Sequence, residues 1–517
     1  MTTAYDNYRW RRTEPNRWER DADEAEIAYS ALIKLYEGSG RMEFAITGHV
    51  SLAISLLQGE SADAASDLLD ECLGVAWLRL RHQMPTIASR VVYDSSVGKW
   101  KKIYDAVTNE TERAAWLQET FKTVANGQTG VEWANSDPPA PEVATIFSIA
   151  APAASSTPLE IRRDIVLRSP HDIIDGIGTL QLLNAFAHHV SEALDQGPRH
   201  DLPPFNLSEI ARLSPPYRIA AAVPEQPTPQ QAEKIVAIQT IQPESSSRVQ
   251  TIGIPFKAGP LLPGKHQRVA HVIPSSRTTK LLAALKSVGA TPTHAFHAAI
   301  PMVVRDLHSE ANPSLEGKQV QYVNYILRNE RQSCRPPFNT PAHSSSVYHS
   351  ISGGKLTVTM YNSVPPTGEK RNQGFLRILD EIKSFYLAIR DDKDHYALAP
   401  YIWAKNTSEL RYPKTNDTAE WKGLNPVPKP NDKPSVSISS MGLIDRMVDA
   451  QVGRVRVDNP WVTGEELGTG LGLFLGTFKG VLELSAAYND AWHDKEEVER
   501  FLTRCEEIVF GWLDSLE

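Results

Sequence analysis

The stretch "DIVLRSPHDIIDGIGTLQLLNAF", residues 164–186, decides the fold of this protein. Its first part, "DIVLR", is typical of a buried strand, and "GIGTLQLLNAF" has the apolar spacing of a helix that we expect to end at about residue 196. His171, Asp175 and Gly176 therefore lie at a junction between a strand and a helix. Because the strand fixes the backbone and the turn exposes the side chain, a junction of this kind favours a reactive group.

The three residues allow two readings. A histidine with a pKa near 6.5 is a capable general base at neutral pH, Asp175 could orient it or pair with a basic side chain elsewhere, and Gly176 would allow a tight turn. Alternatively, His171 is an ordinary loop histidine and Asp175 a helix N-cap. The first reading is favoured because none of the other 14 histidines has an aspartate four residues later.

Composition limits the class of protein. A chain of 517 residues is long enough for two large lobes, and a net charge of -8 excludes the basic field that nucleic acid or an anionic membrane requires. The three cysteines are far apart in the sequence, which is typical of a reducing compartment and indicates neither disulfides nor a zinc site. With no leader and no long apolar run, we expect a soluble, cytoplasmic protein.

The chain divides into three parts. Residues 1–197 form a predicted N-terminal lobe, residues 198–265 are a proline-rich connector, and residues 266–517 form a predicted C-terminal lobe. After the connector we expect a strand, a helix capped by Ser275 or Ser276, and a second helix that begins at Thr291. Because helices alternate with strands in both lobes, the predicted class is α/β with two lobes of similar size.

Several segments resemble one family. "HDIIDG" resembles the H-x-x-x-D-G signature of the CoA-dependent acyltransferase superfamily, which includes plant BAHD enzymes, condensation domains, chloramphenicol acetyltransferase and fungal trichothecene acetyltransferases. The resemblance extends over roughly residues 40–515, and the long N-terminal extension and proline-rich connector look most like the trichothecene 15-O-acetyltransferase type. Three further segments are similar to this family: "KLLAALKSVGATPTHAFHAAIPMVVRD" (280–306), "VNYILRNE" (323–330) and "VLELSAAYNDAWHDKEEVERFL" (481–502).

The resemblance implies a fold and a reaction. Two lobes, each a mixed sheet with helices, would meet along an active-site channel, and a monomer would bind acyl-CoA and a small-molecule alcohol. His171 would act as general base in moving an acetyl group from acetyl-CoA to a hydroxyl of a hydrophobic secondary metabolite, such as the C-15 hydroxyl of a trichothecene. No acyl-enzyme and no permanently bound cofactor or metal would be needed. The family also implies a structural salt bridge for Asp175, with Arg328 as the candidate partner.

The sequence departs from the family pattern in two places. Pro170 stands where many members have a second histidine, and "SSMGLID" (439–445) occupies the place of the D-F-G-W-G motif of the plant enzymes. Ser439 and Ser440 could line the channel and donate hydrogen bonds to an oxyanion, or they could be ordinary strand residues.

Two alternatives remain open at this point. The chain could be a condensation-type enzyme whose donor is attached to a carrier protein, or a binding protein of the same fold without catalysis. The intact histidine and aspartate motif counts against the second alternative.

Overall fold

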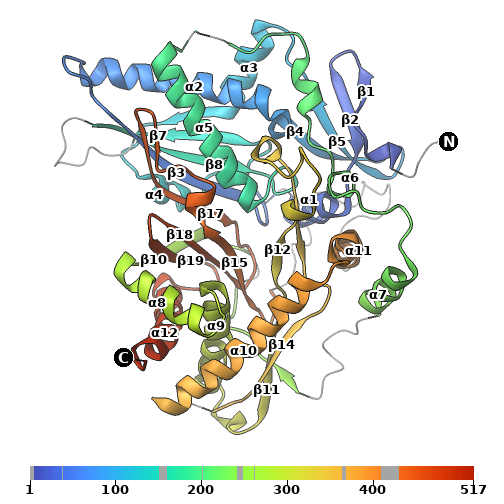
Figure 1. The fold of residues 1–517 in the computed structure, drawn as a ribbon, viewed down its shortest axis with the longest axis vertical. Coiled ribbons are helices and arrows are strands. Elements are labelled where there is room, and N and C mark those ends of the chain that lie inside the picture. The colour runs from blue at the N-terminus through green and yellow to red at the C-terminus, as the bar shows by residue number, and fades with distance from the viewer. Residues whose placement is uncertain are drawn as a thin grey trace.

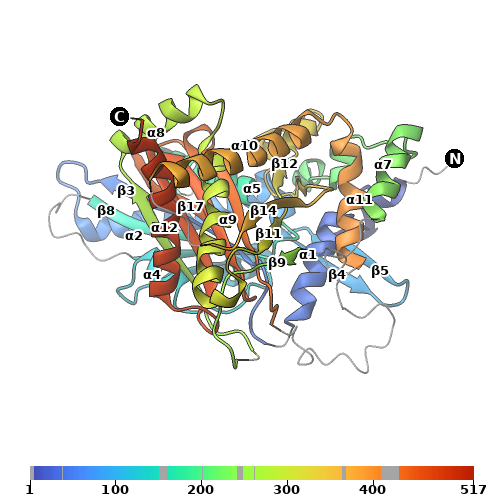
Figure 2. The same ribbon diagram turned by 90° about the horizontal axis from the view of Figure 1, so that it is seen from below.

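The computed structural model describes residues 5–37, 39–150, 160–198, 200, 202–240, 249–260, 262–363, 368–408 and 430–516. Its described residues form two lobes, one above the other in Figure 1 and seen from below in Figure 2. Each lobe has a sheet covered by helices, as the sequence predicts. Within the described part of the chain, no helix combines the length and the apolar composition needed to cross a membrane.

The N-terminal lobe is built on a six-stranded sheet with the order β16-β17-β3-β8-β7-β6. Strands β3 and β8 pair antiparallel along their whole length, from Ile46 opposite Ser169 to Ser55 opposite Glu160. Nine of the ten residues of β3 are buried, so both faces of this strand are covered. Helices α2 and α5 pack together over the sheet. The elements of this part of the chain are β1 (Arg11–Glu14), β2 (Arg17–Asp21), α1 (Glu24–Leu35), β3 (Ile46–Ser55), α2 (Ala62–Gln83), β4 (Ser89–Asp94), β5 (Lys99–Asp105), α3 (Glu110–Thr120), β6 (Phe121–Val124), α4 (Gly130–Ala134), β7 (Thr145–Ile149), β8 (Glu160–Ser169) and α5 (Gly176–Gln196).

The C-terminal lobe contains a four-stranded sheet with the order β10-β19-β18-β15 and a three-stranded sheet with the order β14-β11-β9. Helix α9 packs against α10 and α12, and its buried face is part of the main core of this lobe. The elements of this part of the chain are α6 (Tyr217–Ala220), α7 (Pro229–Gln239), β9 (Gln250–Thr251), β10 (His266–Ile273), α8 (Ser275–Ser287), α9 (Pro292–Ala311), β11 (Gln319–Asn324), β12 (Leu327–Asn329), β13 (His349–Ile351), β14 (Leu356–Tyr361), α10 (Glu369–Asp391), α11 (His395–Ser408), β15 (Val436–Leu443), β16 (Gln451–Val452), β17 (Val455–Gly464), β18 (Leu471–Phe478), β19 (Val481–Asn489) and α12 (Lys495–Asp514).

Two strands cross between the lobes. Strands β16 and β17 belong to the C-terminal half of the sequence, yet β17 pairs antiparallel with β3, β16 pairs with β17, and both extend the sheet of the N-terminal lobe. The sequence pattern placed all of residues 266–517 in the C-terminal lobe, because nothing local in a strand shows which sheet it joins. The crossing places β17 beside β18, where the two lobes meet.

The local predictions were partly right. Helix α5 ends at Gln196, and Thr291 caps α9 by accepting a hydrogen bond from the amide of His294 at 3.4 Å. Helix α8 begins at Ser275, but Pro274 precedes it and supplies no side-chain cap, so the predicted serine cap is wrong. The connector also has structure of its own, since it contains α6 and α7.

Candidate functional site

The junction between β8 and α5 is the loop of residues 170–175, called here the His171 loop. Asp175 is the N-cap of α5, and its Oδ1 accepts a hydrogen bond from the amide of Gly178 at 2.8 Å. The cap is the role that the alternative sequence reading gave to Asp175. A cap and a salt bridge are compatible because each uses a different carboxylate oxygen.

The second oxygen of Asp175 ties the His171 loop to the other half of the chain. Oδ2 accepts a hydrogen bond from Nη1 of Arg331 at 2.8 Å and another from the amide of Tyr348 at 2.9 Å. Both of these donor residues are buried. Burial alone would raise the pKa of the Asp175 carboxyl, but Arg331 and His349 beside it hold the pKa well below its usual range. The carboxylate is therefore charged and fully partnered, which suits a structural role.

The predicted partner of Asp175 was wrong. Arg328 lies on β12, and its Nε is 3.5 Å from the carboxylate of Glu330 instead. Arg331, three residues later, follows the end of the strand and turns toward the N-terminal lobe. A strand reverses the direction of its side chains at every residue, so sequence distance alone could not choose between the two arginines.

The opposite end of the loop is held by buried polar groups. Oδ2 of Asp172 accepts a hydrogen bond from the hydroxyl of Ser30 at 2.7 Å. The ammonium group of Lys102 donates to the carbonyl of Asp172 and to the carboxylate of Glu26, at 2.8 Å each. Burial raises the pKa of Asp172 to about 6. Both ends of the His171 loop are thus fixed, which limits how far His171 can move.

His171 is held between aromatic rings. The ring of Tyr29, from α1, stacks on the imidazole with a centroid distance of 3.7 Å and an angle of 9° between the planes. The hydroxyl of Tyr29 forms a hydrogen bond of 2.8 Å with Nε2 of His349, whose ring centroid is 5.5 Å from that of His171. Sequence reasoning missed both Tyr29 and His349. No local motif marks them, since they come from positions more than 100 residues away on either side.

The environment of His171 favours its neutral form. Burial, followed by the nearby ring of His349, lowers the pKa of His171 to about 3, while the carboxylate of Asp175 acts in the opposite direction. Nδ1 is buried and makes no hydrogen bond of normal geometry with the described residues. His171 lines a cavity, and its Nε2 is not among the buried atoms without a partner, which makes Nε2 the candidate proton acceptor. A neutral imidazole with one available nitrogen can accept a proton.

The cavity at His171 has a volume of about 420 Å³ and is lined by residues of both lobes. Ser439 and Ser440 of β15 line it, as proposed from the sequence, and the hydroxyl of Thr293 donates to that of Ser440 at 2.9 Å. Arg328 also lines the cavity. The remaining lining residues are Tyr29, Asp175, Gly176, Ile177, Leu327, Asn329, Arg331, His349, Tyr386, Ile438, Met441 and Gly442.

Gly176 does not have the role expected from the sequence. Its φ is not positive, so the helix start does not need a glycine for its backbone conformation. A Cβ at this position would instead lie 3.4 Å from Cε and 3.5 Å from Sδ of Met441. Contacts of this length are ordinary van der Waals packing, so neither the backbone conformation nor the space around Gly176 requires a glycine, and the tight turn that the sequence suggested is not found.

Comparisons with known proteins found two acetyltransferases similar to this chain. The chain is 25% identical over 509 residues to the O-acetyltransferase pigM of Monascus ruber, across 97% of this chain and 86% of that protein. It is 23% identical to the acetyltransferase pigO of Monascus ruber, with 94% of each chain covered. No family model matches the chain.

Solved structures share the whole fold. The trichothecene 15-O-acetyltransferase TRI3 of Fusarium sporotrichioides matches with a TM-score of 0.78 and 17% identity over 99% of both chains. The condensation domain of the Monacolin K polyketide synthase MokA matches with a TM-score of 0.57 and 11% identity, over 96% of this chain and 97% of that one. The predicted two-lobed α/β fold is confirmed.

Proposed function

We propose that this chain transfers an acetyl group from acetyl-CoA to a hydroxyl of a hydrophobic secondary metabolite. The proposal starts from an acyltransferase with the fold of the CoA-dependent acyltransferase and condensation-domain superfamily. The observation that carries the proposal is the place of His171 in the wall of a cavity shared by both lobes, in surroundings that favour the neutral ring. A general base in such a position contributes about 10²–10⁴ to the rate.

His171 is the proton carrier of the proposed reaction. Nε2 accepts the proton of the acceptor hydroxyl as the oxygen attacks the thioester carbonyl carbon. The new C–O bond forms, the C–S bond breaks, and the proton passes from His171 to the leaving thiolate. The products are an ester and free CoA, and the acyl group is never attached to the protein.

Other groups of the cavity support this reaction. Tyr29 fixes the plane of the imidazole, and Asp175 holds the loop without taking part in proton transfer. The hydroxyls of Ser440 and Thr293 line the same cavity and are candidate donors to the oxyanion that forms on the carbonyl oxygen.

The acceptor is proposed as a class of compound, and two kinds of acceptor from that class are named for testing. A 15-hydroxy trichothecene is the first acceptor to test, because the sequence resembles the trichothecene acetyltransferase type and TRI3 shares the fold. An acceptor of the kind used by the Monascus acetyltransferases is the second, since their sequences align over nearly the whole chain.

The test is the release of free thiol from acetyl-CoA in the presence of each acceptor. His171→Ala should abolish the acceptor-dependent release, whereas His188→Ala should not. His188 is a matched control because it lies on α5, is half exposed and pairs with Asp449 outside the cavity. Equal rates in wild type and His171→Ala would contradict the proposed role of His171.

The remaining outcomes distinguish the alternatives. Activity with a carrier-bound acyl group and none with acyl-CoA would indicate a condensation-type enzyme. Binding of an acceptor without release of thiol from any donor would indicate a binding protein of the same fold.

A further inference from the structure

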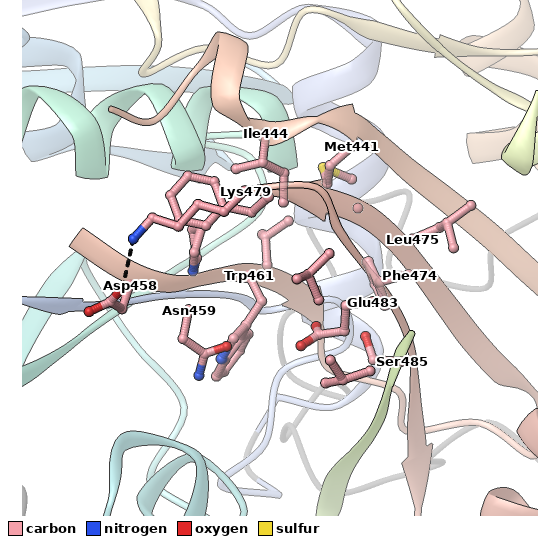
Figure 3. Close-up of a pocket in the computed structure, with 16 residues that line it drawn as sticks. Met441, Ile444, Asp458, Asn459, Trp461, Phe474, Leu475, Lys479, Glu483 and Ser485 are labelled. Carbon is pink, nitrogen blue, oxygen red and sulfur yellow. Dashed lines mark hydrogen bonds and ion pairs between the residues drawn. The ribbon is translucent and has the colours of Figure 1, made fainter. Parts of the chain in front are cut away.

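A second cavity, of about 230 Å³, lies where β17 crosses from one lobe to the other. Strands β15, β17, β18 and β19 form its walls, and Figure 3 shows the side chains that line it. Most of the lining is apolar, with Trp461, Val462, Phe474 and Phe478 among its members. A concave apolar site of this kind is suited to a small ligand.

The charged groups at this second cavity are already paired. Lys479 forms an ion pair with Asp458 at 2.8 Å, drawn as the dashed line in Figure 3. The carboxylate of Glu483 pairs with Arg268. A charged ligand would have to break one of these pairs, so the lining favours a neutral, apolar occupant.

Met441 is shared by the two cavities, because it lines both of them. On one side its thioether lies against Gly176, at the start of the helix that follows the His171 loop. On the other side its Cβ is 3.8 Å from the position of a Cβ on Gly476, which lines the second cavity. Figure 3 shows Met441 beside Ile444, on the side of the cavity away from Ser485.

A bulge explains the position of this methionine. The pairing of β15 with β18 shifts register between Ser440 and Gly442, and Gly442 has a φ of +67°. A bulge interrupts the alternation of side chains along a strand. The serines can therefore line the His171 cavity while the next residue separates it from the second one.

We propose that the second cavity is a binding site for an unbranched aliphatic acyl chain, and that Met441 closes it and restricts the enzyme to short acyl groups. This inference rests on the proposed acyl transfer at His171. A methionine side chain is itself an unbranched chain of four atoms, so removing it leaves a passage of the width of an acyl chain. Such a passage is too narrow for a ring system, which favours the donor chain over the acceptor as the occupant.

The test replaces Met441 by alanine and measures thiol release with acetyl-, butyryl-, hexanoyl- and octanoyl-CoA. Met441→Ala should raise kcat/KM for octanoyl-CoA, relative to acetyl-CoA, by on the order of tenfold or more. Met447→Ala is the matched control, since Met447 is also half-buried against the N-terminal core but lines neither cavity. It should leave the ratio unchanged.

A second substitution tests where the longer chain lies. Val481 lines the second cavity at the start of β19, and Val481→Phe in the Met441→Ala background should fill it and reverse the gain. An unchanged octanoyl-to-acetyl ratio in Met441→Ala would overturn the inference, and so would a gain that persists in the double variant.

A binding measurement separates this inference from the proposed function. In His171→Ala proteins, calorimetry with octanoyl-CoA should show tighter binding when Met441 is also replaced by alanine. If wild type releases no thiol from any acyl-CoA but this difference appears, the proposed reaction fails and the binding site stands. If wild type transfers acetyl groups and the difference is absent, only the binding site fails.

Discussion

The ring of Tyr29 lies parallel to the imidazole of His171, 3.7 Å away, and the hydroxyl of the same tyrosine binds Nε2 of His349 at 2.8 Å. One side chain from α1 thus touches two histidines that are 178 positions apart in the sequence. The stack limits rotation of the ring proposed to carry the proton, and the hydrogen bond fixes the orientation of the second ring.

Removing the stack should lower turnover more than binding. We expect Tyr29→Ala to lower kcat by up to about 10²-fold with little change in KM, because a misplaced base slows proton transfer without touching the bound substrate. Tyr29→Phe keeps the stack and loses only the hydrogen bond to His349, so its loss should be smaller. Steady-state kinetics at matched thermal stability would check this. Equal losses in the two variants would show that the stack itself has no role.

The salt bridge of Asp175 should be essential for stability. Arg331→Ala leaves a buried carboxylate without its main partner, and we expect a loss of about 3–5 kcal/mol in the free energy of unfolding. Arg328→Ala is the control, because Arg328 is more exposed and lies 3.5 Å from its partner Glu330, which also has other hydrogen bonds. Chemical denaturation should give a clearly smaller loss for Arg328→Ala, and the opposite order would contradict the assignment of Arg331.

The pH dependence of activity should reflect the low pKa of His171. Burial lowers this pKa to about 3, and the proposed reaction needs the neutral ring, so the acid limb of kcat/KM should lie well below pH 6.5. Activity should therefore vary little across the range in which an ordinary histidine titrates, about pH 5 to 8. His349→Asn removes a neighbour that disfavours the protonated form of His171, and should shift the limb to higher pH. A wild-type limb near pH 6.5 would argue against a buried base.

Gly178 lies so close to the backbone of Ser344 that its position should not tolerate a side chain. A Cβ on Gly178 would lie 2.1 Å from the carbonyl oxygen of Ser344, so we expect Gly178→Ala to destabilise the protein by about 1–3 kcal/mol. Gly511, in helix α12, has no atom within 4 Å of its own Cβ position. Gly511→Ala should stabilise the protein by up to about 1 kcal/mol, because alanine favours a helix more than glycine does. Similar changes in melting temperature for both variants would show that the backbone at Ser344 moves to make room for the added methyl group.

Much of the fold could be predicted from local patterns. The apolar run of β8, the spacing of α5 and the capping threonine of α9 each depend on neighbouring residues, and all three are found in the structure. Residues 41–57 read from the sequence alone as a pair of strands, whereas the structure has one long strand there, β3. No residue in this stretch requires a turn, so the apolar pattern alone could not show whether it forms one strand or two.

The sequence by itself determined the α/β class, the strand-to-helix junction and the position of His171 and Asp175 within it. These features arise from periodicity and from contacts within a few residues, which a sequence records directly. Only the tertiary structure decided that Arg331 pairs with Asp175, that Tyr29 and His349 lie beside His171, and that Met441 lines two cavities. Those relationships join residues far apart in the sequence, several of them in different lobes, and they depend on how the strands are paired and on which way each side chain points when the lobes meet.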